Sequence, residues 1–173
     1  MSQFTLILDN TRSNYNVGAI LRTCDAAGIS TIFACGTTPY PAQKDDKRDP
    51  VVVNRNTREI AKTALGAEAT VTIEYRNSTE EAIAELKARG WHIYALEQTA
   101  KSHNLFEFRA QFPTALLLGN ETVGISAAVL KLCEAVVEIP QQGTKESLNV
   151  SVSAGIAVYQ FRRQMADWRQ PGD

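Results

Sequence analysis

The sequence predicts an α/β domain in which a mostly parallel sheet carries helices on both faces. Six short runs of apolar or β-branched residues indicate strands, at positions 5–8, 31–34, 71–73, 92–96, 115–118 and 136–139. Each run is nearly continuous in apolar character, which is typical of strands buried on both faces of a parallel sheet. Helical patterns separate several runs, and this alternation favours one α/β domain over residues 1–173, with its core at 3–168.

Two helices between strands are predicted by apolar spacing and capping residues. Ser13 or Asn14 can cap a helix in which apolar residues recur every three or four positions until Gly28 stops it. A second helix opens at Ser78, continues with an apolar stripe and ends at Gly90.

The last predicted helix covers residues 148–168. Leu148, Val152 and Tyr159 belong to an apolar stripe at helical spacing, and Gly155 would let another backbone come close. This pattern fits a buried core helix behind a polar entry loop as well as a helix with a functional role.

One long segment, residues 36–53, interrupts the alternation of strands and helices. It holds three of the six prolines together with many charged residues. A loop of this length within a compact domain is usually functional or disordered, so a solvated mobile loop and a functional loop both stay open.

Composition excludes several classes of protein. The chain is 44% hydrophobic and 21% charged, as in globular domains, and no apolar run approaches the roughly 20 residues that span a bilayer. The N-terminus does not resemble a secretory leader, and Cys24, Cys35 and Cys133 are too scattered for a zinc site or a disulfide framework. His92 and His103 stand alone, so no metal is expected. These observations predict that the protein works in a reduced, cytoplasmic compartment.

The segment after the first strand, residues 14–22, reads NYNVGAILR. Arg22 lies one turn after Gly18, so its side chain is expected to lean over a residue that has none. This would place the guanidinium above the carboxyl end of a strand, the usual ligand edge of an α/β sheet. A surface arginine paired with Asp25 is the plainer alternative.

Two further segments follow buried strands. Residues 116–126 read LLLGNETVGIS, in which Gly119 would let a ligand approach the backbone, Gly124 turns the chain and Ser126 can cap a helix. Turn geometry alone would also explain the glycines, and no GxGxxG fingerprint occurs. Residues 139–154 read IPQQGTKESLNVSVSA and lead from a strand through a polar turn into the last helix.

Together these segments resemble the three motifs of the SpoU/TrmH group of RNA ribose methyltransferases, within the SPOUT superfamily. The matching patterns are NxGxIxR at 16–22, GNExxGIS at 119–126 and IPxxGxxxSLNVSVSA at 139–154. Their order and spacing cover almost the whole chain, and the third pattern is long and specific. The chain is therefore identified as a minimal catalytic-domain member, without a separate RNA-binding extension.

The resemblance implies a homodimer that uses S-adenosylmethionine to methylate a ribose 2′-hydroxyl in tRNA or rRNA. It also implies the SPOUT fold, in which the C-terminal part of a parallel sheet forms a deep trefoil knot that holds the cofactor, and two subunits complete the active site. Apolar residues and main-chain amides suit an adenine ring. The residues expected to hold the cofactor are Leu96, Gly119, Asn120, Ile139, Ser147 and Leu148.

Four residues are expected to be catalytic by the same resemblance: Arg22, Asn16, Asn149 and Glu121. A guanidinium stays charged in proteins, so Arg22 is expected to hold a phosphate and to stabilise negative charge on the 2′-oxygen rather than to act as a base. Asn16 is expected to orient Arg22 or the ribose, and Asn149 to shape the same pocket. Glu121 should have a partner, either basic groups across the dimer or the knot loops.

A net charge of −1 does not favour nucleic-acid binding, so positive charge must be concentrated locally or pooled between subunits. The tyrosines among the candidates could stack on bases. The candidate RNA-binding residues are Arg12, Tyr15, Tyr40, Lys44, Lys47, Arg48, Arg55, Arg58 and Lys145. Asp45, Asp46 and Asp49 dilute this set, so a mixed-charge solvated loop is the alternative.

Two other functions stay open. A non-catalytic RNA-binding module with a vestigial cofactor site is disfavoured by the intact Arg22, Asn120, Glu121, Ser147 and Asn149. A nicotinamide-dependent dehydrogenase is disfavoured because no glycine-rich fingerprint follows the first strand. Neither the choice between tRNA and rRNA nor the methylated nucleotide follows from the sequence.

Overall fold

The computed structural model describes residues 3–167, and within them seven strands form a sheet flanked by five helices. The strands are β1 (Phe4–Asp9), β2 (Thr31–Cys35), β3 (Thr72–Arg76), β4 (His92–Leu96), β5 (His103–Asn104), β6 (Thr114–Leu118) and β7 (Ala135–Glu138). The helices are α1 (Asn14–Ala26), α2 (Pro50–Ala64), α3 (Thr79–Ala88), α4 (Ala127–Leu130) and α5 (Val150–Arg162), with a short 3-10 turn η1 (Ala67–Ala69).

Every strand pair in the described sheet is parallel, and the strand order is β3-β2-β1-β6-β4-β7-β5. Strand β1 lies between β2 and β6, with Leu6 opposite both Ile32 and Leu116. Because the strands run in one direction, their carboxyl ends meet at a single edge of the sheet. The predicted parallel sheet is confirmed, whereas the trefoil knot stays a prediction.

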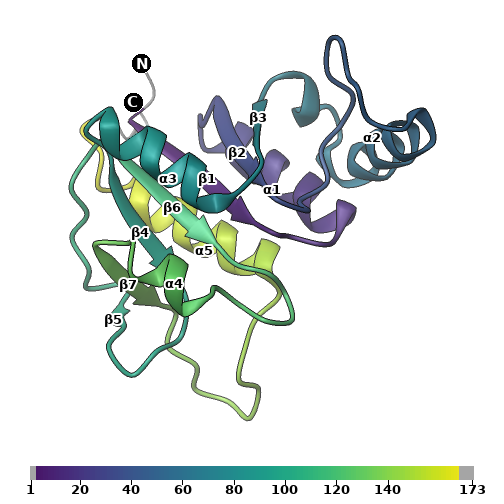
Figure 1. Cartoon of the computed structure of the whole chain (residues 1–173). Helices are drawn as coiled ribbons and strands as arrows, with labels where there is room; N and C mark the ends of the chain where they lie inside the picture. The colour runs from purple at the N-terminus through teal and green to yellow at the C-terminus, as the bar shows by residue number, and fades with distance from the viewer. Residues whose placement is uncertain (1–2, 168–173) are drawn as a thin grey trace.

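Helices cover both faces of the sheet, with α3 and α4 in front and α5 behind in Figure 1. Alternate residues of β1 point to opposite sides. Phe4 belongs to a first hydrophobic core cluster, which also includes residues of α1 and α5. Its ring stacks on Phe161, with ring centroids 5.5 Å apart. Ile7 lies in the second cluster, together with Leu86 of α3 and Val129 of α4. The sheet is thus buried on both faces, as its continuous apolar strands predict.

Side-chain caps fix where several helices begin. Ser13 accepts a hydrogen bond from the N–H of Asn16 at the start of α1, and Ser78 and Ser126 cap α3 and α4 in the same way. Gly28 follows α1 with a φ of 72°, a left-handed conformation that glycine adopts without strain. These predicted helix boundaries agree with the structure.

The expectation of a loop throughout residues 36–53 is wrong at its C-terminal end. Helix α2 begins at Pro50 and is capped by Asp49, whose Oδ1 accepts a hydrogen bond of 2.7 Å from the N–H of Val51. Proline at the first position of a helix loses no intrahelical hydrogen bond, so here it starts a helix. The last helix ends at Arg162, short of the predicted end, and Trp168 lies outside the described residues.

Helix α2 packs directly on α1 at Gly18. A Cβ at this position would collide with Thr63 Oγ1 and with the carbonyl oxygen of Ile60. The space above Gly18 is therefore filled by α2, and the predicted path of Arg22 across Gly18 to the ligand edge is wrong.

No helix within residues 3–167 combines the length and apolar character needed to cross a membrane.

Candidate active site

A pocket of about 530 Å³ opens at the carboxyl edge of the sheet, where β4, β6 and β7 end beside the start of α5. Small-molecule sites typically have about 300–1,000 Å³, so the pocket is large enough for a nucleoside-sized ligand. All six residues predicted to hold the cofactor line it: Leu96, Gly119, Asn120, Ile139, Ser147 and Leu148. Their role as cofactor-binding residues stays a prediction.

Gly119 lies at a crowded part of the pocket wall. A Cβ there would be 2.9 Å from the carbonyl carbon of Gly124 and 3.0 Å from the amide nitrogen of Ile125. Glu97 holds the same turn, because its Oε2 accepts a hydrogen bond of 3.0 Å from the N–H of Ile125. The absence of a side chain at Gly119 therefore lets two backbone segments approach each other at the edge of the pocket.

Asn120 ties this turn to the end of β1. Its Nδ2 donates to the carbonyl oxygen of Asn10 at 2.7 Å, and its Oδ1 accepts from the N–H of Thr122 at 2.8 Å. Asn10 has a φ of 52°, which asparagine tolerates better than most residues, and its Oδ1 accepts from the N–H of Thr37 at 3.0 Å. The motifs do not single out Asn10, although an asparagine directly after a strand is a signal for such a turn.

Glu121 connects the second motif to the first. Its Oε2 accepts a hydrogen bond of 2.9 Å from the N–H of Arg12, and its Oε1 accepts from the N–H of Ser13 at 3.2 Å and from Asn16 Nδ2 at 2.8 Å. Partial burial alone would raise the pKa of Glu121, but these donors stabilise the carboxylate and the pKa is lowered. Within one chain the partner of Glu121 is thus the start of α1, not a basic side chain.

Asn149 connects the third motif to the first. Its Nδ2 donates to Asn16 Oδ1 at 3.2 Å, while its own Oδ1 accepts from the N–H of Ser151 at 2.8 Å and caps α5. Asn16 therefore lies between Glu121 and Asn149. A continuous chain of hydrogen bonds joins residues of all three motifs beside the pocket.

Arg22 does not line this pocket. It is exposed on α1 and lines a separate hollow together with Lys62 and Tyr159. It follows Asn16 by six residues, which places it roughly 9 Å further along the helix and about 120° around the axis. Among residues 3–167, Arg22 makes no ion pair with Asp25. The alternative that Arg22 is a surface arginine paired with Asp25 therefore has no support either.

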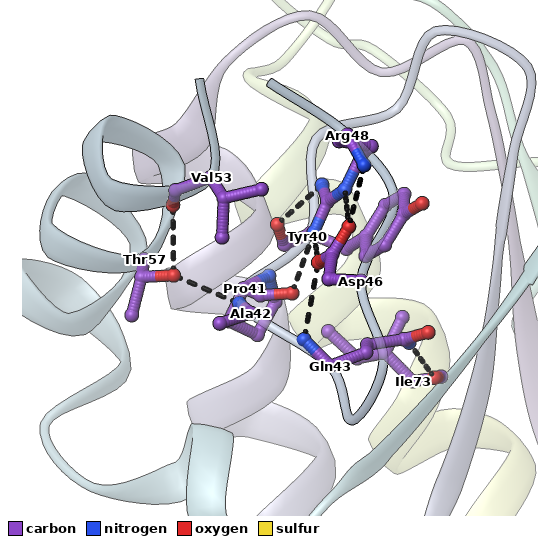
Figure 2. A network of polar contacts seen from close by, with 9 residues as sticks. All are labelled: Tyr40, Pro41, Ala42, Gln43, Asp46, Arg48, Val53, Thr57 and Ile73. Carbon is purple, nitrogen blue, oxygen red and sulfur yellow. Dashed lines mark hydrogen bonds and ion pairs between the residues drawn. The ribbon is translucent and has the colours of Figure 1, made fainter. Parts of the chain in front are cut away.

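Arg48 holds together the loop before α2, as Figure 2 shows. Its guanidinium donates to the carbonyl oxygens of Tyr40 and Pro41 at 3.0 Å each, and to Asp46 Oδ2 at 2.6 Å. It also lies 3.4 Å from the centroid of the Tyr40 ring. The hydrogen bonds from Arg48 hold the pKa of the Asp46 carboxyl well below its usual range.

Tyr40 is only 9% exposed and stacks on Tyr75, so the prediction that it stacks on an RNA base is wrong. Arg48 uses four of its N–H groups within the loop, which leaves little capacity for an RNA phosphate. The other candidates are exposed, and their contact with RNA stays a prediction: Arg12, Tyr15, Lys44, Lys47, Arg55, Arg58 and Lys145.

Three carboxylates line the pocket at the carboxyl edge of the sheet, from Glu97, Glu121 and Glu138, and no lysine or arginine of the described chain lines it. The motifs do not mark Glu97 or Glu138, although one follows β4 directly and the other ends β7. Ser102 Oγ donates to Glu138 Oε2 at 2.5 Å. Among residues 3–167, no group of three or more His, Cys, Asp or Glu side chains is arranged to hold a metal ion.

A family model described as the SpoU rRNA Methylase family matches residues 3–159. The chain belongs to the SpoU rRNA methylase family. It is 31% identical over 156 residues to the tRNA (guanosine(18)-2′-O)-methyltransferase of Aquifex aeolicus (strain VF5), which covers 90% of this chain and 67% of that protein. It is 33% identical over 159 residues to the 23S rRNA (guanosine-2′-O-)-methyltransferase RlmB of Neisseria meningitidis serogroup B, which covers 92% of this chain and 58% of that protein.

The fold of this SpoU chain also matches solved structures. The SpoU methyltransferase AviRb from Streptomyces viridochromogenes, solved in complex with the cofactor AdoMet, has a TM-score of 0.75 at 27% identity, over 94% of this chain and 60% of that one. The SpoU chain therefore spans between 58% and 67% of the length of these three proteins. The predicted family and the predicted enzyme class, an RNA 2′-O-methyltransferase, are confirmed.

Proposed function

We propose that this protein transfers a methyl group from S-adenosylmethionine to a ribose 2′-hydroxyl of tRNA or rRNA, and that it works as a homodimer. The observation that carries the proposal is the hydrogen-bond chain from Glu121 through Asn16 to Asn149. It holds the three motif segments around one pocket at the carboxyl edge of the sheet. The proposed place of action is the cytoplasm.

The pocket fits S-adenosylmethionine in size and in chemistry. Leu96 and Ile139 offer apolar surface to an adenine ring, and the backbone beside Gly119 offers hydrogen-bonding groups. The cofactor carries a positive sulfonium and an ammonium group. Within residues 3–167 the pocket is lined by carboxylates and by no lysine or arginine, which favours such a cation.

The bound cofactor supplies an activated methyl group, and the chain supplies position and charge. Asn16 is held on both sides, by Glu121 and by Asn149, so the start of α1 is fixed relative to the pocket. Arg22, further along α1, carries a permanent positive charge that would stabilise the negative charge on the ribose oxygen as its proton leaves. Correct placement of the hydroxyl is the other main contribution.

A second subunit is needed because Arg22 is not part of the pocket of its own chain. We assign self-association to the apolar residues along α5, because Val152 and Tyr159 are 51% and 43% exposed and Leu148, just before the helix, is 40% exposed. Exposed apolar surface of this kind marks interaction sites. Gly155 on the same helix has open space where a Cβ would be, so another backbone can come close.

Methyl transfer is tested with the purified protein, labelled S-adenosylmethionine and bulk tRNA or rRNA from cells that lack this protein. We expect label at ribose 2′-oxygens, recognised because a 2′-O-methylated linkage resists alkaline hydrolysis. Cofactor binding is measured in parallel by calorimetry. A protein that binds the cofactor but labels neither RNA pool would be a non-catalytic module, and the proposal would fail.

The dimer is tested by mixing two inactive variants, Arg22→Ala and Gly119→Val. If Arg22 serves the pocket of the partner subunit, mixed dimers contain one complete site, and random exchange restores about a quarter of the wild-type activity. If Arg22 serves its own pocket, mixing restores nothing. Sedimentation of each variant alone checks that both are folded and dimeric, and Glu121→Ala is a second pocket variant if Gly119→Val fails that check.

A further inference from the structure

A second hollow, of about 450 Å³, lies between α1, α2 and α5. Its lining includes Arg22 and Thr23 from α1, Lys62 and Thr63 from α2, and Tyr159 from α5. No aspartate or glutamate of residues 3–167 lines it, whereas the cofactor pocket is lined by three glutamates and by no lysine or arginine. The two hollows are therefore opposite in charge.

The two cations of this hollow have unused hydrogen-bond donors. The Arg22 side chain makes no hydrogen bond or ion pair with any residue in the described range, so its five N–H groups are free to bind an anion. Lys62 Nζ donates to Glu59 Oε1 at 2.8 Å and to the Tyr15 hydroxyl at 3.4 Å. An ammonium group has three protons, so one donor of Lys62 is left.

Glu59 holds Lys62 in place without neutralising the hollow. The Glu59 side chain is 18% exposed, and its Oε1 also lies 3.5 Å from the Nε of Arg58. Two cations therefore face one carboxylate. Hydrogen bonds from Lys62 and Tyr15 lower the pKa of Glu59 to about 2. The hydrogen bonds of Lys62 with Glu59 and with Tyr15 raise the pKa of Lys62 above its ordinary value. Lys62 therefore keeps its charge at neutral pH and at a fixed place.

We propose that this hollow is a binding subsite for a backbone phosphate of the RNA substrate, held by Arg22 and Lys62. The proposal rests on the proposed function and adds Lys62 and helix α2 to it. Arginine binds phosphate through a planar fork of donors, and lysine adds a compact positive charge. A single phosphate accepts several hydrogen bonds, which suits two cations that line one hollow.

Tyr15 extends this subsite towards the catalytic residues. Its ring is 48% exposed, and Lys62 Nζ lies 5.7 Å from the ring centroid. Thr63 Oγ1 donates to the Tyr15 carbonyl oxygen at 2.9 Å, so α2 fixes this residue as well. An exposed, fixed aromatic ring next to a phosphate site is a platform on which a neighbouring base can stack.

The position of the hollow agrees with an active site that is completed by two subunits. Tyr159 lines the hollow and also belongs to the exposed apolar stripe of α5 that we assign to self-association. A phosphate held by Arg22 and Lys62 of one subunit would therefore lie at the margin of the dimer interface. RNA bound there can reach across the interface to the cofactor pocket of the partner.

The test is the salt dependence of RNA binding by Lys62→Gln, with bulk tRNA and bulk rRNA as separate probes. We expect affinity to fall about 5- to 10-fold near 0.1 M salt, and the slope of log affinity against log salt to decrease by about 1, because one phosphate contact is lost. Lys62→Arg should keep most of the affinity. The KM for RNA should rise while cofactor affinity, measured by calorimetry, stays at the wild-type value.

Lys131→Gln is the matched control, because Lys131 is exposed beside α4 on the other face of the sheet. Equal RNA affinity and equal salt slope for Lys62→Gln and Lys131→Gln would overturn the proposal. So would a loss of RNA affinity that accompanies dissociation into monomers in sedimentation, because the hollow would then be filled by a second copy. If Lys62→Gln loses RNA affinity but the wild type methylates no RNA, the subsite stands and the proposed function fails.

Discussion

Asn16 and Glu121 are joined by a hydrogen bond of 2.8 Å from Nδ2 to Oε1, although 105 residues separate them in the sequence. The same carboxylate accepts from the N–H groups of Arg12 and Ser13, so the loop after β6 and the start of α1 form one unit. Because α1 also carries Arg22, the placement of this arginine, which we propose to be catalytic, depends on a residue of the pocket wall.

Glu121→Gln should loosen this unit. The amide offers one acceptor oxygen where the carboxylate offers two, so at least one of the three donors loses its partner, at a cost of roughly 1 kcal/mol for a partly exposed site. We expect cofactor affinity to fall several-fold and methyl transfer to fall further, measured by calorimetry and by label incorporation. Glu107→Gln, at an exposed position outside both hollows, should change neither quantity.

Arg22→Ala should abolish turnover while the protein still binds S-adenosylmethionine. Removing one group that stabilises developing negative charge typically lowers the rate by about 100-fold or more. Single-turnover methyl transfer and calorimetry measure the two effects separately. Lost cofactor binding in this variant would contradict the separation between the pocket and the arginine.

Gly119→Ala should damage the pocket, and Gly143→Ala should not. A Cβ at Gly119 meets the backbone of Gly124 and Ile125 at 3.0 Å or less, whereas nothing lies within 4 Å of a Cβ at Gly143. Overpacking of this kind costs about 1–3 kcal/mol, so thermal unfolding should shift down only for Gly119→Ala, together with a loss of cofactor affinity. Equal behaviour of both variants would contradict the crowded pocket wall.

Val152→Glu should convert the proposed dimer into a monomer. A charge in the middle of an apolar interface is costly to bury, and Val152 is 51% exposed in the single chain, so the fold itself should survive. Sedimentation and circular dichroism measure assembly and folding. Val51→Glu, on α2 and 75% exposed, is the control that should leave assembly unchanged.

The lowered pKa of Glu121 gives a pH dependence with a definite sign. Its carboxylate is stabilised in the folded chain, so its contribution to stability is complete above the ordinary value of 4.5 and is lost as pH falls through the lower, folded pKa. The difference in unfolding free energy between wild type and Glu121→Gln should therefore shrink as pH falls below about 4.5. A difference that grows on acidification would show that the assigned donors are wrong.

The motif segments were predictable because each follows a strand, and strand ends of a parallel sheet meet at one edge. This is why Gly119, Ile139 and Ser147 line one pocket. The packing partner of Gly18 was not predictable from its spacing with Arg22, since it depends on α2, a helix hidden in a segment rich in proline and charge.

The loop before α2 illustrates the same limit. Charge counting treats Arg48 as available to RNA, because spacing along the chain does not reveal its contacts with Asp46 and the Tyr40 ring. The sequence does not predict a role for Lys62, because its contact with Tyr15 and its place beside Arg22 depend on how α2 packs on α1.

The bond between Asn16 and Asn149 spans 133 residues, so the groups that we propose to be catalytic can come together only after Asn149 has been synthesised. Contacts between such distant segments form late and slowly in folding. A nascent or truncated chain that ends before Asn149 would have its central strands but no complete pocket. Cofactor binding by this protein therefore requires that Asn149 has been synthesised and has reached Asn16 at the start of α1.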